Sequence, residues 1–108
     1  MRLPSETLIA REKVEKYLLQ WRPEGDKSAF LALAGYTSMS VDALMTDLRS
    51  QLLPLEAEII EQSNYGPKYR IRGTLMGPNG RTLRVVSIWI TEEATGETRF
   101  ITLYPDKP

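Results

Sequence analysis

Residues 65–89, YGPKYRIRGTLMGPNGRTLRVVSIW, decide how this chain folds. Two runs rich in Tyr, Ile, Val and Thr, at 68–76 and 81–90, lie on either side of the turn sequence GPNG at 77–80. Such runs, separated by a short loop that contains Pro and Gly, are typical of a β-hairpin. The segment carries basic residues and no acid, although the whole chain has 14 basic and 14 acidic residues. We therefore expect a positively charged hairpin at the centre of the fold.

The turn sequence predicts the register of the two strands. Pro78 presets φ for the first turn position and Gly80 can take the left-handed conformation that follows, which favours a three-residue loop. Gly77 then pairs with Arg81. Because side chains alternate between the faces of a sheet, one face is predicted to collect Tyr69, Ile71, Leu75, Leu83, Val85 and Trp89. The other face is predicted to collect Lys68, Arg70, Arg72, Thr74, Thr82, Arg84, Val86 and Ile88.

The apolar face is predicted to be core, whereas the basic face has two interpretations. It is either the solvated side of an antiparallel sheet or a surface that binds an anion. A two-residue loop would slip the pairing by one and bring Trp89 to the basic side. Lys68, Arg70 and Arg72 share one face of the sheet in both registers.

Composition limits the class of protein. At 108 residues the chain is expected to form a single domain (1–108), with a helical half at 1–53 and a sheet half at 55–105. The absence of cysteine and histidine excludes disulfides, thiolate nucleophiles, and the commonest general base and metal ligand. We expect no metal and no cofactor. Because no apolar run approaches ~20 residues and no signal segment precedes the first helix, a cytoplasmic protein without membrane contact is predicted.

Charge is distributed unevenly along the chain. The net charge of zero argues against indiscriminate nucleic-acid binding, and DNA is not expected as a partner. Residues 1–63 hold seven basic and ten acidic side chains, whereas 64–108 hold seven basic and four acidic ones. This asymmetry favours a local anion site on the sheet half.

Three helices are predicted ahead of the sheet. The first spans about 10–20, because Val14, Tyr17, Leu18 and Trp21 follow an i, i+3, i+4, i+7 stripe. Tyr17 and Trp21 could stack against a ligand. An aromatic residue on an apolar stripe is more often part of the core, and that is the interpretation we favour.

The second helix is expected to begin after Asp26, a good N-cap, and to stop at Gly35. Its inward-facing residues would be Phe30, Leu33 and Ala34. Lys27 opens this helix and is either a surface lysine or, beside free backbone N–H groups, a group that grips a phosphate. The third helix follows Ser40, ends before Pro54 and has an apolar stripe of Val41, Leu44, Met45, Leu48 and Leu52.

Four strands, at 55–63, 68–76, 81–90 and 99–104, complete the predicted order. About three N-terminal helices followed by strands with short turns predict an α+β fold. In it the helices pack on one face of a roughly four-stranded antiparallel meander sheet. The hydroxyls of Thr102 and Tyr104 would then lie near the arginines, a set able to bind a phosphodiester and to stabilise charge on phosphorus.

Several short motifs carry a resemblance to a known family. They are Lys16 with the Leu pair after it, Lys27-x-x-Phe30 followed by Gly35, Tyr65-Gly66-x-x-Tyr69, Gly77-Pro78-Asn79-Gly80, Trp89, and Thr102-x-Tyr104-Pro105. Together they resemble an uncharacterised small bacterial domain that occurs alone and as the C-terminal module of polymorphic toxins. That domain is similar to the ribonuclease toxins that include barnase, EndoU, the colicins and RelE-type nucleases.

The resemblance implies a cleft on the uncovered side of the sheet. Its catalytic residues would be Lys27, Arg72, Thr102 and Tyr104. Its RNA-binding residues would be Lys68, Arg70, Arg84 and Trp89. The implied function is a metal-independent endoribonuclease toxin that cleaves RNA and is neutralised by a small acidic antitoxin or immunity protein. Because this chain departs from the histidine-using members, the alternative is a non-catalytic interaction module that binds an acidic protein partner through the same face.

Overall fold

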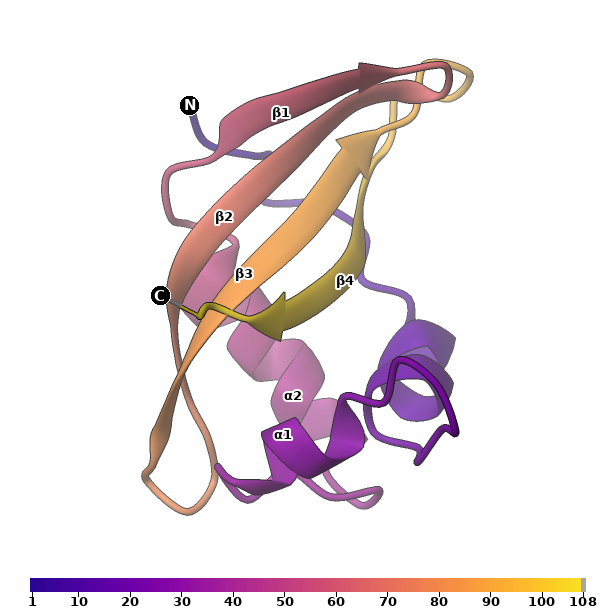
Figure 1. Cartoon of the computed structure of the whole chain (residues 1–108). Coiled ribbons are helices and arrows are strands. Elements are labelled where there is room, and N and C mark those ends of the chain that lie inside the picture. The colour runs from indigo at the N-terminus through magenta and orange to yellow at the C-terminus, as the bar shows by residue number, and fades with distance from the viewer. Residues whose placement is uncertain (108) are drawn as a thin grey trace.

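A computed structural model describes residues 1–107 and has an α+β architecture with a four-stranded antiparallel sheet (Figure 1). The helical segments are η1 (Lys13–Leu18), α1 (Ser28–Ala32), α2 (Val41–Asp47) and η2 (Leu48–Leu52). The strands are β1 (Glu58–Ser63), β2 (Gly66–Met76), β3 (Thr82–Thr91) and β4 (Thr98–Pro105). The strand order β1-β2-β3-β4 is the predicted meander.

The β2–β3 hairpin has the register that its turn sequence predicts. The Gly77 amide donates to the Arg81 carbonyl at 3.0 Å, and Gly80 closes the turn with φ of +84°. Leu75 lies opposite Leu83, and Tyr69 lies opposite Trp89. The predicted alternation of apolar and basic faces is therefore confirmed.

The tip of this hairpin is anchored to the end of α1. The Asn79 amide side chain donates to the Leu33 carbonyl at 3.1 Å, and the Asn79 backbone N–H donates to the Ala34 carbonyl at 3.2 Å. Gly77 packs so closely that a Cβ added there would lie 2.0 Å from the Ala34 carbonyl oxygen. The GPNG motif thus serves the fold, because it both turns the strand and docks the turn against a helix.

Within residues 1–107, four short helical segments of five to seven residues replace the three longer helices we expected. The segments α2 and η2 are continuous, and their predicted stripe is confirmed by the burial of Val41, Leu44, Leu48 and Leu52. Leu31 in α1 and Ala34 just after it are buried, so Leu33, 54% exposed, was wrongly assigned to the core. The amides of residues 33–35, which follow α1, bond to carbonyls three residues back and tighten the last turn up to Gly35 at φ +92°.

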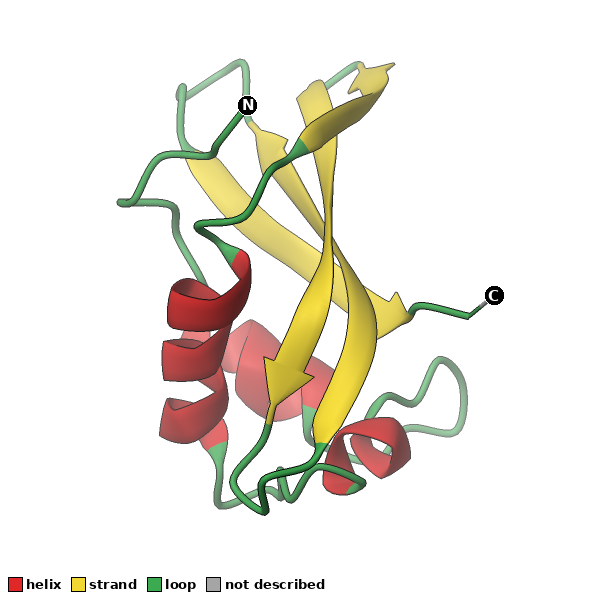
Figure 2. Ribbon diagram, turned by 90° about the vertical axis from the view of Figure 1, so that its left-hand side faces the viewer, coloured by secondary structure: helices red, strands yellow, loops and turns green. Residues whose placement is uncertain are grey.

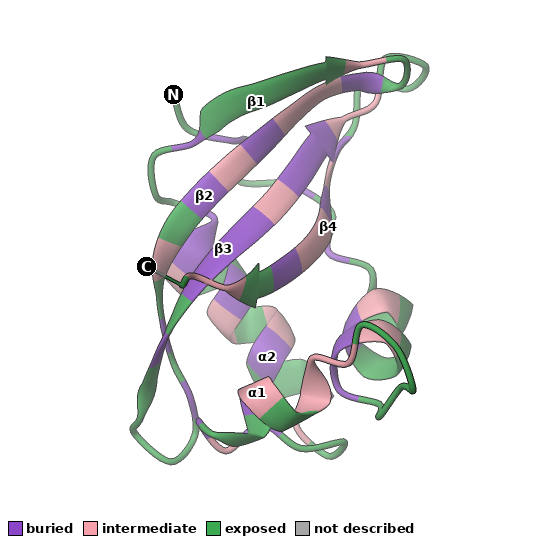
Figure 3. Ribbon diagram, viewed as in Figure 1, coloured by how far each residue is buried: buried purple, intermediate pink, exposed green. Residues whose placement is uncertain are grey.

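The core lies between the sheet and the α2–η2 helix. That helix runs along one face of the sheet, and α1 lies across its lower end (Figures 1 and 2). Along β2 buried residues are separated by exposed or half-buried ones, whereas β3 is buried continuously over residues 85–87 and again at Trp89 and Ile90 (Figure 3). The largest fully buried side chains of the sheet are Trp89, Ile71, Leu75, Leu103 and Val85. The Trp89 and Phe100 rings meet edge to face with centroids 5.1 Å apart.

Strand β1 differs from the other three because almost all of it is exposed (Figure 3). It forms one edge of the sheet and pairs only with β2. Its acids face the basic residues of β2 across the pair, with Glu58 opposite Arg70 and Glu61 opposite Lys68. The composition of this edge strand therefore determines how much positive charge on β2 is left free.

Candidate functional site

The open face is the side of the sheet that faces away from the α2–η2 helix (Figure 2). The pairing places its residues in rows that run across the strands. One row joins Arg72, Val86 and Tyr104, and the next joins Arg70, Ile88 and Thr102. We define the open face by Lys68, Arg70, Arg72, Thr74, Arg84, Val86, Ile88, Thr102 and Tyr104. Of the eight predicted site residues, six lie on this face. Lys27 lies elsewhere, beside Tyr17, and Trp89 is buried on the opposite face.

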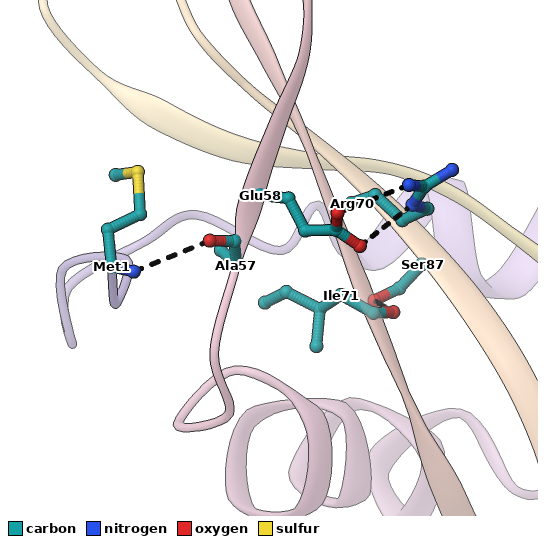
Figure 4. Close-up of polar contacts among 6 residues, drawn as sticks. All are labelled: Met1, Ala57, Glu58, Arg70, Ile71 and Ser87. Carbon is teal, nitrogen blue, oxygen red and sulfur yellow. Dashed lines mark hydrogen bonds and ion pairs between the residues drawn. The ribbon is translucent and has the colours of Figure 1, made fainter.

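Two of the basic residues on this face are paired with carboxylates of β1. The Arg70 guanidinium binds both oxygens of Glu58, with N–O distances of 3.2 and 3.3 Å (Figure 4). This contact lowers the pKa of Glu58 below its ordinary value and raises the pKa of Arg70 above its own. The Lys68 ammonium lies 4.0 Å from a Glu61 carboxylate oxygen. The paired charges largely cancel, so Lys68 and Arg70 contribute less positive potential than the sequence suggests.

Arg72 and Arg84 form the positive centre of the open face. Both side chains are exposed, and neither makes an ion pair with another residue of the described chain, 1–107. They flank Val86, which is only 2% exposed although it lies on the face without the helix. Tyr104, 41% exposed, lies two strands from Arg72, about 10 Å at ordinary strand spacing. This part of the face combines two free guanidinium groups with a phenol and an apolar floor.

Trp89 lies on the opposite face and has no exposed surface. Its indole N–H donates to the Ser87 hydroxyl at 2.8 Å, and that hydroxyl donates to the Ile71 carbonyl at 3.0 Å. A stacking contact with a nucleotide is therefore not open to Trp89. The alternation of the strand places it in the core, and the position that the family resemblance implied for it is corrected.

Lys27 lies beside η1, in a second cationic region below the sheet. Its ammonium is 5.5 Å from the centroid of the Tyr17 ring and 3.4 Å from the Gly25 carbonyl oxygen. Lys13 and Arg22 approach the same ring at 5.3 and 4.5 Å. We name Lys13, Tyr17, Arg22 and Lys27 the Tyr17 cluster. Within residues 1–107, no hydrogen bond or ion pair joins Lys27 to Arg72, Thr102 or Tyr104.

Trp21 is 71% exposed, which contradicts its assignment to the core. The helical winding of η1 ends at Leu18, so the stripe that Val14 and Leu18 begin does not continue to residue 21. Proline at position 23 and glycine at 25 were the available signal that the chain leaves the helix here. The aromatic residue that sequence reasoning placed inside thus lies on the surface, next to Arg22 of the Tyr17 cluster.

The comparison with known families gives a match over nearly the whole chain. A family model described as "Domain of unknown function (DUF6883)" matches residues 3–107. The chain belongs to this family. No curated protein and no solved structure matches it. Membership agrees with the resemblance to an uncharacterised domain and provides no link to the ribonuclease toxins. Within residues 1–107, no helix has the length and apolar character needed to cross a membrane.

Proposed function

We propose that this DUF6883 chain is a non-catalytic interaction module that binds an acidic protein partner through the open face. The observation that carries the proposal is the exposure of the Arg72 and Arg84 guanidinium groups, which form no ion pair within residues 1–107, beside Val86 and Tyr104. Arg and Tyr are the residue types enriched at the energetic centres of protein interfaces. A guanidinium fork also suits bidentate contacts with the carboxylates of a partner.

A protein partner suits this face better than a nucleic acid does. Acidic side chains border the arginines, since Glu58 and Glu61 line β1 and the Asp106 amide bonds to the Arg84 carbonyl at 2.9 Å. A nucleic-acid backbone presents negative charge only, one per nucleotide, whereas this face carries charges of both signs. A folded partner can match both the positive centre and the acidic rim, because its own surface carries charges of both signs.

The first test uses a short Asp- and Glu-rich peptide that also contains Leu, with a Lys-rich peptide of the same apolar content as the control. We expect NMR shift changes at Arg72, Tyr104 and Thr102 with the acidic peptide only, and binding that weakens as salt rises. Arg72→Glu should weaken binding by at least about fivefold. Equal shift changes with both peptides, or no loss in Arg72→Glu, would contradict the proposal.

A second candidate is the endoribonuclease, because Arg72, Tyr104 and Thr102 share the open face. Arg72 would neutralise the phosphate and Tyr104 would move a proton while a 2′-hydroxyl attacks phosphorus. Lys27 contacts the Tyr17 ring instead, so in this candidate it has a supporting role at most. A small acidic antitoxin and a cytoplasmic location belong to this proposal too.

Incubation of the purified protein with total RNA separates the two candidates. The interaction module predicts intact RNA at every protein concentration. The ribonuclease predicts cleavage that is lost in Arg72→Ala and Tyr104→Phe and kept in Arg2→Ala, which changes an exposed arginine far along the chain from the open face. Cleavage with that pattern would overturn the interaction module as the whole function. Toxicity on expression, relieved by the product of a neighbouring acidic gene, would point the same way.

A further inference from the structure

The Tyr17 cluster gathers three positive side chains around one aromatic ring. The Lys13, Arg22 and Lys27 head groups all lie within 5.5 Å of one ring centroid, so no two of them are further apart than twice that distance. Like charges at such distances repel, although salt screens the repulsion in part, since the upper limit exceeds the Debye length of about 8 Å at physiological salt. Exposed cation–π contacts offset the repulsion only weakly. An anion bound among them would relieve the repulsion.

Two of the acids near this cluster, Asp26 and Glu12, are engaged in contacts with other groups. The Asp26 carboxylate accepts hydrogen bonds from the Ser28 hydroxyl at 2.7 Å and from the Arg22 amide at 3.2 Å. The Ser28 hydrogen bond is the main cause of its lowered pKa. Glu12 forms an ion pair with Lys16 at 3.7 Å. Among residues 1–107, no carboxylate forms an ion pair with any of the three cations of the Tyr17 cluster.

Two hollows next to each other give a ligand room to bind. One, of about 330 Å³, is lined by Ala10, Glu12, Lys13, Lys16, Tyr17 and Arg22. The other, of about 560 Å³, is lined by Lys16, Gln20, Trp21, Arg22, Pro23 and Glu24. They share Lys16 and Arg22, so the cationic hollow and the one that contains Trp21 adjoin. Their volumes fall in the range of small-molecule sites, about 300–1,000 Å³.

We propose that this region binds the phosphate group of a nucleotide at the Tyr17 cluster while the nucleotide base stacks on Trp21. The indole is exposed and follows Arg22 directly in sequence, so an aromatic surface and a cationic one are presented together. This pairing is the one that proteins use to bind unpaired nucleotides, where bases stack on aromatic rings and basic side chains contact the backbone. The arginine adds a planar group that can form two hydrogen bonds to a phosphate.

The ligand has two sources, a free nucleotide or one residue of a single strand. The site does not rest on the open face, because the residues that form it come from η1 and the loop before α1. Arg72→Glu should therefore leave nucleotide binding unchanged, and failure of one proposal says nothing against the other. Arg72→Glu also serves as the matched control for the loss of a surface arginine.

The test uses fluorescence titration, since the exposed Trp21 responds to a stacked base while the buried Trp89 does not. The probes are adenosine monophosphate, adenosine, inorganic phosphate and a short oligoadenylate. We expect adenosine monophosphate to bind at least about fivefold more tightly than adenosine or phosphate alone. Arg22→Ala and Lys27→Ala should each weaken that binding, and Arg72→Glu should not.

Calorimetry with Trp21→Ala and Trp21→Phe measures the stacking contribution without relying on the fluorescent reporter. Trp21→Ala should weaken binding by at least about fivefold, and Trp21→Phe should recover part of the loss. Tighter binding of the oligoadenylate than of the mononucleotide would identify a strand as the ligand, and equal binding would identify a free nucleotide. Phosphate binding as tightly as adenosine monophosphate, or no effect of Arg22→Ala and Trp21→Ala, would overturn the proposal.

Discussion

Strands β2 and β3 have two faces that are built from alternate residues of the same hairpin but are covered in different ways. On the core face, Ile71, Leu75 and Val85 have no exposed surface and pack against the helices. On the open face, Arg72 and Arg84 are exposed, and Val86 is buried without being part of the core cluster. Alternation therefore assigns a side chain to a face, whereas its neighbours determine whether it is free to act.

The two faces also differ in how their polar groups are paired. On the core face every donor of this pair has an acceptor: the Trp89 indole N–H donates to the Ser87 hydroxyl, which donates to the Ile71 carbonyl, and leaving either donor unpaired would cost about 1–3 kcal/mol. On the open face Arg72 and Arg84 form no ion pair within residues 1–107, whereas Lys68 and Arg70 pair with acids of the exposed edge strand β1. Contacts of this exposed kind are weak and easily exchanged for a ligand.

The largest effect is expected on the core face. Trp89→Ala should lower the free energy of unfolding by about 3–5 kcal/mol, because it removes the largest fully buried side chain and leaves a cavity. Trp21→Ala is the matched control and should change it by less than about 0.5 kcal/mol. Urea denaturation of the two variants measures both values. Similar losses in the two would mean that Trp21 is packed as well as Trp89 is.

A smaller loss is expected where the hairpin meets α1. Gly77→Ala places a methyl group against the Ala34 carbonyl and should cost about 1–3 kcal/mol, as overpacking does. Gly25→Ala offers a comparison, because its Cβ would meet nothing within 4 Å and any cost would come from its φ of +65°. Thermal unfolding of both variants distinguishes a steric clash from backbone strain. A fully stable Gly77→Ala protein would show that the hairpin tip is not held against the helix.

Tyr36 should make the core sensitive to alkali. Burial, together with its hydrogen bond to Asp47 at 2.6 Å, raises the pKa of Tyr36 above its ordinary value. The unfolded chain therefore loses this proton first, so the stabilisation is complete below about pH 10 and is lost as the pH rises above it. Tyr36→Phe should cost about 1 kcal/mol near neutral pH and remove that part of the alkaline loss. Urea midpoints of the two proteins across this pH range test the sign.

The smallest change in stability is expected on the open face. Glu58→Gln breaks an exposed ion pair and should alter the urea midpoint little, while it frees Arg70 and strengthens binding of the acidic peptide. The pKa of Glu58 is lowered by its hydrogen bond from Arg70, so the pair stabilises the fold above about pH 4.3 and is lost below it. Unchanged peptide binding in Glu58→Gln would mean that Arg70 is not part of the binding surface.

Much of the sheet could be predicted because its signals are local. The turn at Pro78 and Gly80 determines the hairpin register, and the register assigns every side chain of β2 and β3 to a face. The stripe of the third predicted helix was found for the same reason, since Leu44, Leu48 and Leu52 lie one turn apart. The helix at 10–20 was predicted too long, because its end depends on where the chain leaves η1 rather than on the stripe itself.

The sequence by itself determined the meander, the two faces of the central hairpin and the excess of basic residues there, because each follows from spacing along a short stretch. Which charges stay free depends on the tertiary fold. It brought Glu58 to Arg70 across a strand pair, exposed Trp21, and gathered Lys13, Arg22 and Lys27 around Tyr17. These outcomes depend on contacts between separate segments of the chain, and the pattern within one segment does not contain them.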